Sequence, residues 1–155
     1  MLRALPLLVL TALSMGFEWP GRVHRLTYEL GRADVARRRE IVRQLGGYTA
    51  AVVEGALLGA LEDEDPEVRR ETARVAGRVR LLEAAPILRD WLDDTEPATR
   101  ATAARALGEI GEPRARDALV RLLADTNAEV RRTAVRALAV LGSKEAVPAL
   151  LGTLD

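Results

Sequence analysis

Apolar and polar positions recur along this chain at a constant spacing of 31 residues. Two columns of leucine show it most clearly, namely Leu26, Leu57, Leu88, Leu119 and Leu150, and Leu30, Leu61, Leu92, Leu123 and Leu154. The same offset superimposes a column of arginines (Arg38, Arg69, Arg100 and Arg131) and a column of small residues (Gly46, Gly77, Gly108 and Ala139). A fixed period of this length is typical of units that bury their apolar face only by stacking. The pattern therefore predicts a repeat protein.

Each period predicts two antiparallel helices. The first is clearest over 65–79, where Asp65 is a suitable N-cap, Pro66 takes the first helical position and apolar residues follow at helical spacing. The second helix carries the leucine columns, and turn residues separate the two. The prediction is an all-α solenoid of about four helix pairs, near 35–61, 66–92, 97–123 and 128–154, after one extra helix near 22–31.

The pattern also indicates which residues are buried. Small residues in the middle of the first helices should let neighbouring helices approach closely, and they are Ala73 and Ala76, Ala103 and Ala104, and Ala134 and Ala137. Leu88 and Leu119 are expected to be almost fully buried between adjacent repeats. Trp91, beside the buried Leu92, is expected to be half-buried between repeats rather than a free binding residue.

Three stretches carry a family resemblance, namely DPEVRR at 65–70, ALGEIG at 106–111 and KEAVPALL at 144–151. They resemble short bacterial HEAT repeats, also described as phycobilin-lyase-like HEAT repeats, and the resemblance covers residues 22–155. It implies the solenoid fold but says little about activity, because HEAT solenoids host unrelated functions.

The resemblance also implies a ladder of charges, in which an aspartate before each first helix bonds with the arginine near its start. Asp63, Asp94 and Asp125 match the aspartate, and Arg69, Arg100 and Arg131 match the arginine. The first repeat has Arg32 in place of the aspartate, so we expect the ladder to fail there. We interpret these charges as structural rather than as a binding stripe.

The charge balance disfavours nucleic acid as a partner. The 155 residues carry 23 basic and 23 acidic side chains, whereas a nucleic-acid footprint needs a net basic face. Arg37, Arg38, Arg39 and Arg43 are the strongest contrary observation. Three consecutive helical residues spread over about 200°, however, so they cannot all face one groove. A solvated outer face is the simpler interpretation.

Catalytic chemistry has little support in the sequence. His24 is the only histidine, cysteine is absent, and neither a phosphate-binding glycine loop nor a nucleophile elbow occurs. The acidic turn Glu62–Asp65 is interpreted as a capping and solvating segment rather than a cation site. HEAT-repeat enzymes that hydroxylate a modified lysine use paired His–Glu ligands, which one histidine cannot supply. We therefore expect no catalytic residue, no metal and no cofactor.

Residues 1–16 resemble a secretory signal peptide. Arg3 precedes an uncharged apolar run, and either Ala12-Leu13-Ser14 or Ser14-Met15-Gly16 offers small residues for cleavage. The run is shorter than the roughly 20 residues that a membrane-spanning helix needs. We expect a periplasmic or extracellular protein, with residues 17–21 as a linker and membrane contact only during export. The alternative is that residues 1–16 form an apolar helix capping the first repeat of a cytoplasmic protein.

The predicted binding surface lies on the second helices, which are expected to line the concave side. Its candidate residues are Glu83, Pro86, Asp90, Arg114, Asp117, Arg121, Glu145 and Pro148. Their columns vary in chemistry while the buried columns do not, as in an adapted groove, although neutral drift gives the same pattern. The prediction is a non-catalytic protein-binding or scaffolding module of the bacterial envelope. The alternative, from the resemblance alone, is an accessory lyase or isomerase that handles a bilin-like chromophore.

The last pair keeps the interior leucine columns, with Leu150, Leu151 and Leu154 close to Asp155. A terminal repeat normally presents a polar outer face. We therefore expect either that the chain is part of a longer repeat array or that it self-associates through this end.

Overall fold

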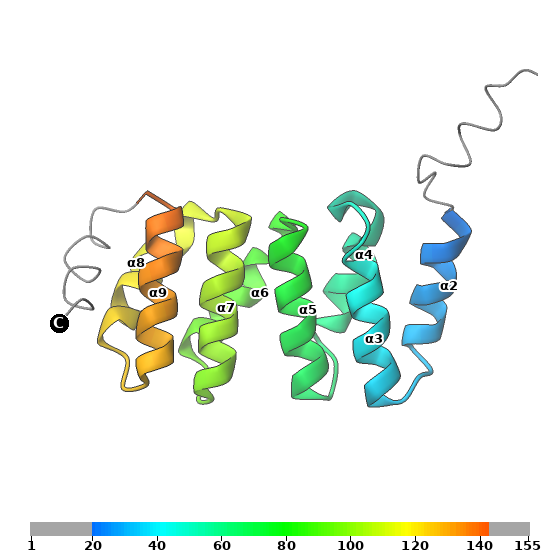
Figure 1. The fold of residues 1–155 in the computed structure, drawn as a ribbon, viewed down its shortest axis with the longest axis horizontal. Helices are drawn as coiled ribbons and strands as arrows, with labels where there is room; N and C mark the ends of the chain where they lie inside the picture. The colour runs from blue at the N-terminus through cyan, green and yellow to red at the C-terminus, as the bar shows by residue number, and fades with distance from the viewer. Residues whose placement is uncertain (1–19, 143–155) are drawn as a thin grey trace, which may run out of the picture.

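A computed structural model describes residues 20–142, which form two rows of helices (Figure 1). One row contains the first helices of the repeats, α3 (Val35–Leu45), α5 (Pro66–Arg78), α7 (Pro97–Ile110) and α9 (Ala128–Val140), and α2 (Pro20–Leu30) precedes them at the position that the 31-residue offset gives to a second helix. The second helices lie behind this row and are α4 (Ala50–Ala60), α6 (Ala85–Asp90) and α8 (Arg116–Arg121). The arrangement is an α-solenoid, and the predicted helix pairs are confirmed as far as Leu141 and Gly142. The expected second helix of the last pair and residues 1–16 lie outside the described residues.

Two of the second helices are short α-helices between 3₁₀ turns. The turns η1 (Leu82–Ala84) and η2 (Trp91–Asp93) flank α6, and η3 (Pro113–Ala115) and η4 (Leu122–Ala124) flank α8. Pro86 in the first turn of α6 and Pro113 at the start of η3 have no N–H to donate to an earlier turn, which suits both to helix starts. At the other end of the molecule, α2 begins at Pro20, so the end of the expected linker is helical.

The predicted N-caps form where the side chain is short enough. Asp65 accepts hydrogen bonds from the N–H groups of Glu67 and Val68, and Asn127 does the same for Glu129 and Val130. Glu96, at the equivalent position, makes no cap bond. Its carboxylate lies instead 2.8 Å from Nη1 of Arg70, because its longer side chain reaches the neighbouring helix.

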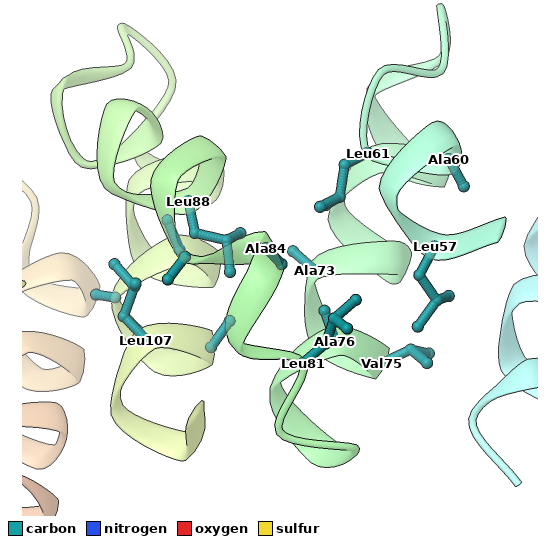
Figure 2. Close-up of a cluster of buried hydrophobic side chains, with 14 of the residues drawn as sticks. Leu57, Ala60, Leu61, Ala73, Val75, Ala76, Leu81, Ala84, Leu88 and Leu107 are labelled. Carbon is teal, nitrogen blue, oxygen red and sulfur yellow. The ribbon is translucent and has the colours of Figure 1, made fainter. Parts of the chain in front are cut away.

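The leucine columns fill the space between the rows. Leu57, Leu88 and Leu119 are all 0% exposed, which confirms the prediction for the last two. Figure 2 shows Leu57 and Leu88 of the second helices in one buried cluster with Ala73 and Leu107 of the first helices. Trp91 is half-buried against this core, as expected.

The column of small residues marks where first helices touch. A Cβ placed on Gly77 would lie 3.0 Å from Cα of Ala106, and one on Gly108 would lie 2.9 Å from both Cα and Cβ of Ala137. The distance at Gly108 is shorter than real Cβ contacts, and the one at Gly77 is tighter than nearly all of them. The backbones of α5, α7 and α9 therefore approach as closely as glycine permits.

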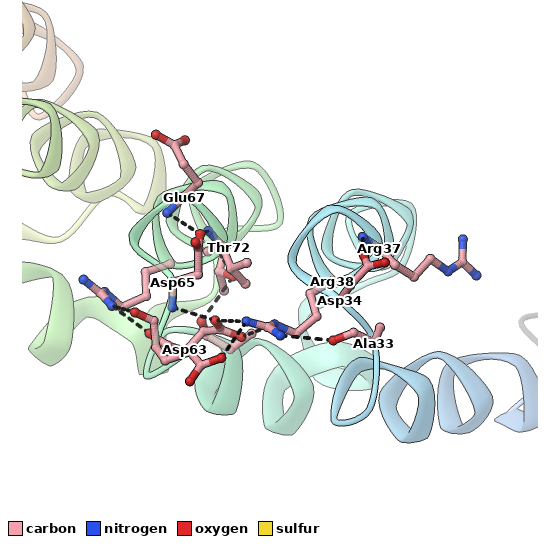
Figure 3. A network of polar contacts seen from close by, with 12 residues as sticks. Ala33, Asp34, Arg37, Arg38, Asp63, Asp65, Glu67 and Thr72 are labelled. Carbon is pink, nitrogen blue, oxygen red and sulfur yellow. Dashed lines mark hydrogen bonds and ion pairs between the residues drawn. The ribbon is translucent and has the colours of Figure 1, made fainter.

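The charge ladder runs forward from one repeat to the next. Nε and Nη2 of Arg38 lie 2.8 and 2.9 Å from the carboxylate of Asp63, and Nε and Nη2 of Arg100 lie 2.7 and 2.8 Å from that of Asp125. Figure 3 shows Arg38 extending to Asp63, with the carbonyl of Ala33 also accepting from it. The expectation that the ladder fails at the first repeat is wrong, because Arg38 uses the aspartate of the following repeat and does not need one at Arg32.

The ladder lacks its middle ion pair, the one between Arg69 and Asp94, within the residues that the structure describes. Arg69 donates to the carbonyl oxygens of Asp63 and Glu64 at 2.7 and 3.0 Å, but among the described residues it forms no ion pair with Asp94. Arg100 and Arg131 donate to their own inter-repeat loops in the same way. Every rung thus ties a loop to a first helix, which supports the structural interpretation of these charges.

Candidate functional site

The described candidates on the second-helix row are all exposed, namely Glu83, Pro86, Asp90, Arg114, Asp117 and Arg121. Glu145 and Pro148 lie outside the described residues. Arg121 is only 3.8 Å from Asp93, and both side chains are mostly exposed, so this pair is weak. Binding through these residues stays a prediction.

The first helices pack more closely on one another than the second helices do. In a curved solenoid, helices on the inner side are closer together than helices on the outer side. The backbone contacts at Gly77 and Gly108 join first helices. The second helices make their main contacts with first helices and 3₁₀ turns rather than with one another. The small residues gather on the first helices and the bulky leucines on the second, so the first helices form the more closely packed row.

A second arginine column lies on this row and escaped the sequence interpretation. It comprises Arg43, Arg74, Arg105 and Arg136, again at a spacing of 31 residues. All four side chains reach the surface, with Arg74 half-buried and the other three exposed. The 31-residue offset alone reveals this column.

Three neighbouring hollows follow the column. Their volumes are about 350, 330 and 270 Å³. Arg43, Arg74 and Arg105 line the first, Arg105 and Arg136 the second, and Arg74 and Arg105 the third. These volumes are at or below the lower end of those of small-molecule pockets. They suit individual side chains of a partner better than a cofactor.

The arginines differ in how they are paired. Arg43 lies 2.8 Å from Glu40 and Arg74 lies 3.0 Å from Glu71, each within its own helix. In the next two repeats these glutamate positions hold Thr102 and Thr133. Within residues 20–142, Arg105 and Arg136 form no ion pair.

A buried arginine near this face has a structural role. Arg70 is only 7% exposed and contacts the carboxylates of Glu67 and Glu96, which joins α5 to the start of α7. The hydrogen bond from Arg70 lowers the pKa of Glu67 below its ordinary value. A buried charge with two partners is costly to disturb, so Arg70 is not available to a ligand.

Other chemistry is sparse in the part of the chain that the structure describes. His24 is exposed on α2. Between Pro20 and Gly142, no group of three or more His, Cys, Asp and Glu side chains is arranged to hold a metal ion. No helix in the same range is both long and apolar enough to cross a membrane.

Comparison with known families gives one match. The family description of HEAT repeats matches residues 23–97 and 88–155. No curated protein sequence matches the chain.

Solved structures also resemble the chain. The complex of CpcE and CpcF of phycocyanin lyase from Nostoc sp. PCC7120 gives a TM-score of 0.70 at 24% identity, over 100% of this chain and 63% of that chain. Human deoxyhypusine hydroxylase in complex with glycerol gives 0.67 at 26% identity, over 85% and 46%. An engineered protein gives 0.62 at 25% identity, over 84% and 67%. The chain thus spans less than two thirds of the length of the lyase-complex and hydroxylase chains, and at 24% identity the first likeness shows the fold alone.

Proposed function

Because this chain belongs to the family of HEAT repeats, we propose that it is a non-catalytic protein-binding or scaffolding module that binds its partner along the row of first helices. The observation that carries the proposal is the continuous series of hollows along α3, α5, α7 and α9, lined at every step by an arginine of one column. Arginine is enriched at the centres of protein interfaces. HEAT-repeat solenoids offer such extended surfaces to other proteins.

Two of the structural neighbours are a phycocyanin lyase complex and a deoxyhypusine hydroxylase. Neither likeness covers two thirds of the neighbour's chain, so their activities are not transferred to this one. The bilin-handling alternative rests on the family resemblance, and no contact among the described residues favours it over a scaffold.

The scaffold proposal is tested by capture from a bacterial envelope fraction with the full chain immobilised. We expect a partner that binds saturably to the wild type and is lost when Arg74 and Arg105 are both changed to Glu. The same number of reversals on the other row, Arg114→Glu with Arg121→Glu, should leave capture intact. If the second pair alone abolishes capture, the second helices are the interface, as the sequence analysis predicted. If no protein binds saturably, the chain is not a binding module of this fraction.

We further propose that residues 1–16 direct export to the periplasm or the exterior. Arg3 and the uncharged apolar run that follows support this proposal. N-terminal sequencing of the expressed protein should find a new terminus near Met15 or Phe17, and a reporter fusion should be active outside the cytoplasm. An intact Met1 on protein in the cytoplasm would favour the capping-helix alternative.

A further inference from the structure

The column three residues before the surface arginines changes from acidic to neutral along the solenoid. It reads Glu40, Glu71, Thr102 and Thr133. The two glutamates neutralise Arg43 and Arg74 at 2.8 and 3.0 Å, whereas a threonine cannot neutralise Arg105 or Arg136. Within this arginine column, the positive charge without a carboxylate partner among the described residues therefore lies on α7 and α9.

Arg105 is the centre of this region. It is exposed and lines all three hollows. Glu109 and Glu129 line hollows beside it, but neither forms an ion pair with it among the described residues. Glu129 pairs with Arg132 at 3.0 Å, and the carboxylate of Glu109 lies over Gly77 of α5.

Thr133 supplies an independent observation. It lines two of the three hollows that Arg105 also lines, and it is only 3% exposed. Its hydroxyl nevertheless has no hydrogen-bond partner. The equivalent hydroxyl of Thr102 donates to the carbonyl of Ala98 at 2.8 Å. A buried polar group without a partner is uncommon and favours a ligand or water that completes it.

Apolar surface adjoins the arginines. Val140, at the end of α9, is 69% exposed and lines one hollow with Arg136, Ala137 and Gly108. An exposed valine beside two arginines suits a ligand that carries both carboxylates and apolar side chains.

We propose that Arg105 and Arg136 bind two carboxylates of an extended acidic segment of a partner protein, whose apolar side chain lies on Val140. This inference rests on the proposed binding function and names its partner chemistry.

Packed helices lie about 8–10 Å apart, so equivalent side chains on α7 and α9 have about that separation. A polyproline II segment rises about 3.1 Å per residue with three residues per turn. Acidic residues at every third position then lie about 9 Å apart on one side, which matches the spacing of the arginines.

A nucleic-acid backbone fits this surface less well. Glu71, Glu109 and Glu129 line the same hollows as the arginines. Phosphates at close and regular spacing need a continuous positive track, whereas on this face acidic side chains alternate with the arginines.

The test is fluorescence anisotropy of the full chain with a labelled synthetic peptide of repeated Glu-Pro-Leu triplets. A peptide of Gln-Pro-Leu triplets and a labelled single-stranded oligonucleotide are the other two probes.

We expect the acidic peptide to bind, the neutral peptide to bind at least tenfold more weakly, and added salt to weaken the acidic complex. Arg105→Gln and Arg136→Gln should each weaken the acidic complex about tenfold, as expected for a lost charge-assisted hydrogen bond. Arg121→Gln, an exposed arginine on the other row, should leave the acidic complex unchanged.

The inference is overturned if the acidic and neutral peptides bind equally or if neither binds. It is also overturned if the acidic complex is insensitive to Arg105→Gln. An oligonucleotide that binds through Arg105 more tightly than the peptide does would overturn it as well. Circular dichroism of each variant shows that the fold is retained. If the envelope partner is still captured through the first-helix row while the acidic peptide fails, the proposed function survives and only the inference about its ligand is wrong.

Discussion

Arg80 is the residue whose backbone conformation fits its side chain least well. Its φ is 56°, in the left-handed region, and the equivalent positions of the next two repeats are Gly111 at 82° and Gly142 at 66°. A residue with a Cβ is strained there by roughly 1–2 kcal/mol, which exceeds the conformational entropy of about 0.4–1 kcal/mol that a glycine adds to the unfolded chain. We expect Arg80→Gly to raise the free energy of unfolding by up to about 1 kcal/mol, measured by urea denaturation.

The control for this change is Arg78→Gly in the last turn of α5, where the residue is helical and exposed. Glycine there should lower stability by as much as about 1 kcal/mol. Equal effects at the two positions would show that the left-handed conformation carries no strain.

The ion pair between Arg100 and Asp125 should make stability depend on pH. The hydrogen bond from Arg100 lowers the pKa of Asp125 below its ordinary value. The unfolded chain, with an aspartate pKa of about 3.9, therefore binds the proton more readily than the folded protein does. The contribution is complete above the unfolded pKa and is lost as pH falls through the lower folded pKa. Asp125→Asn should cost about 1–3 kcal/mol at neutral pH and flatten the loss of stability in acid.

Asp94→Asn is the matched control for that prediction. The carboxylate of Asp94 accepts a hydrogen bond from the N–H of Glu96 at 2.7 Å, as that of Asp125 does from Asn127 at 2.8 Å, but within the described range it forms no ion pair with an arginine. Thermal unfolding followed from pH 7 to pH 3, a range that includes the ordinary aspartate pKa, separates the two. Similar pH profiles for both variants would mean that Arg100 contributes nothing through its charge.

At the scale of the helix, glycine has opposite roles in the two rows. Gly108→Ala would place a Cβ 2.9 Å from the backbone of Ala137, which is not a flexible side chain that can move aside. We expect the free energy of unfolding to fall by about 1–3 kcal/mol because of overpacking between α7 and α9.

Gly55→Ala in α4 would place a Cβ with nothing within 4 Å and should instead raise the free energy of unfolding by about 0.5–1 kcal/mol through helix propensity. Chemical denaturation of both variants checks the signs, and a loss at Gly55 would contradict the assignment of the rows.

The leucine columns stabilise the contact between the rows. Leu88 and Leu119 are 0% exposed, and changing either to alanine should cost about 2–5 kcal/mol through lost burial and the cavity left behind. Replacing the exposed Arg121 with alanine should change stability by less than about 0.5 kcal/mol. Comparable losses at the leucines and at Arg121, again measured by urea denaturation, would contradict the burial pattern.

At the scale of the whole molecule, the sequence predicted what depends on local spacing and missed what depends on how repeats stack. Asp65 as an N-cap and Leu88 as a core residue follow from helical periodicity within one repeat. The partner of Arg38 could not be found in this way, because Asp63 is 25 residues away and comes close only after α3 and α5 have packed. The contacts of Gly77 with Ala106 and of Gly108 with Ala137 likewise depend on how the repeats stack. The column of Arg105 was available from the 31-residue offset alone.

The forward direction of the arginine–aspartate ladder has a consequence for how such chains grow in evolution. Since Arg38 and Arg100 each bond to the aspartate of the unit that follows, removal of the complete period between them leaves both pairs in register. Deletion of residues 66–96 joins Asp65 to Pro97, retains the Arg38–Asp63 and Arg100–Asp125 pairs, and removes Arg70 together with both of its carboxylate partners. Duplication of the same stretch adds a second Arg70 together with its own Glu67 and Glu96 partners. A gene of this type can therefore change length by unequal recombination at almost any breakpoint, provided that the two breakpoints are one full period apart.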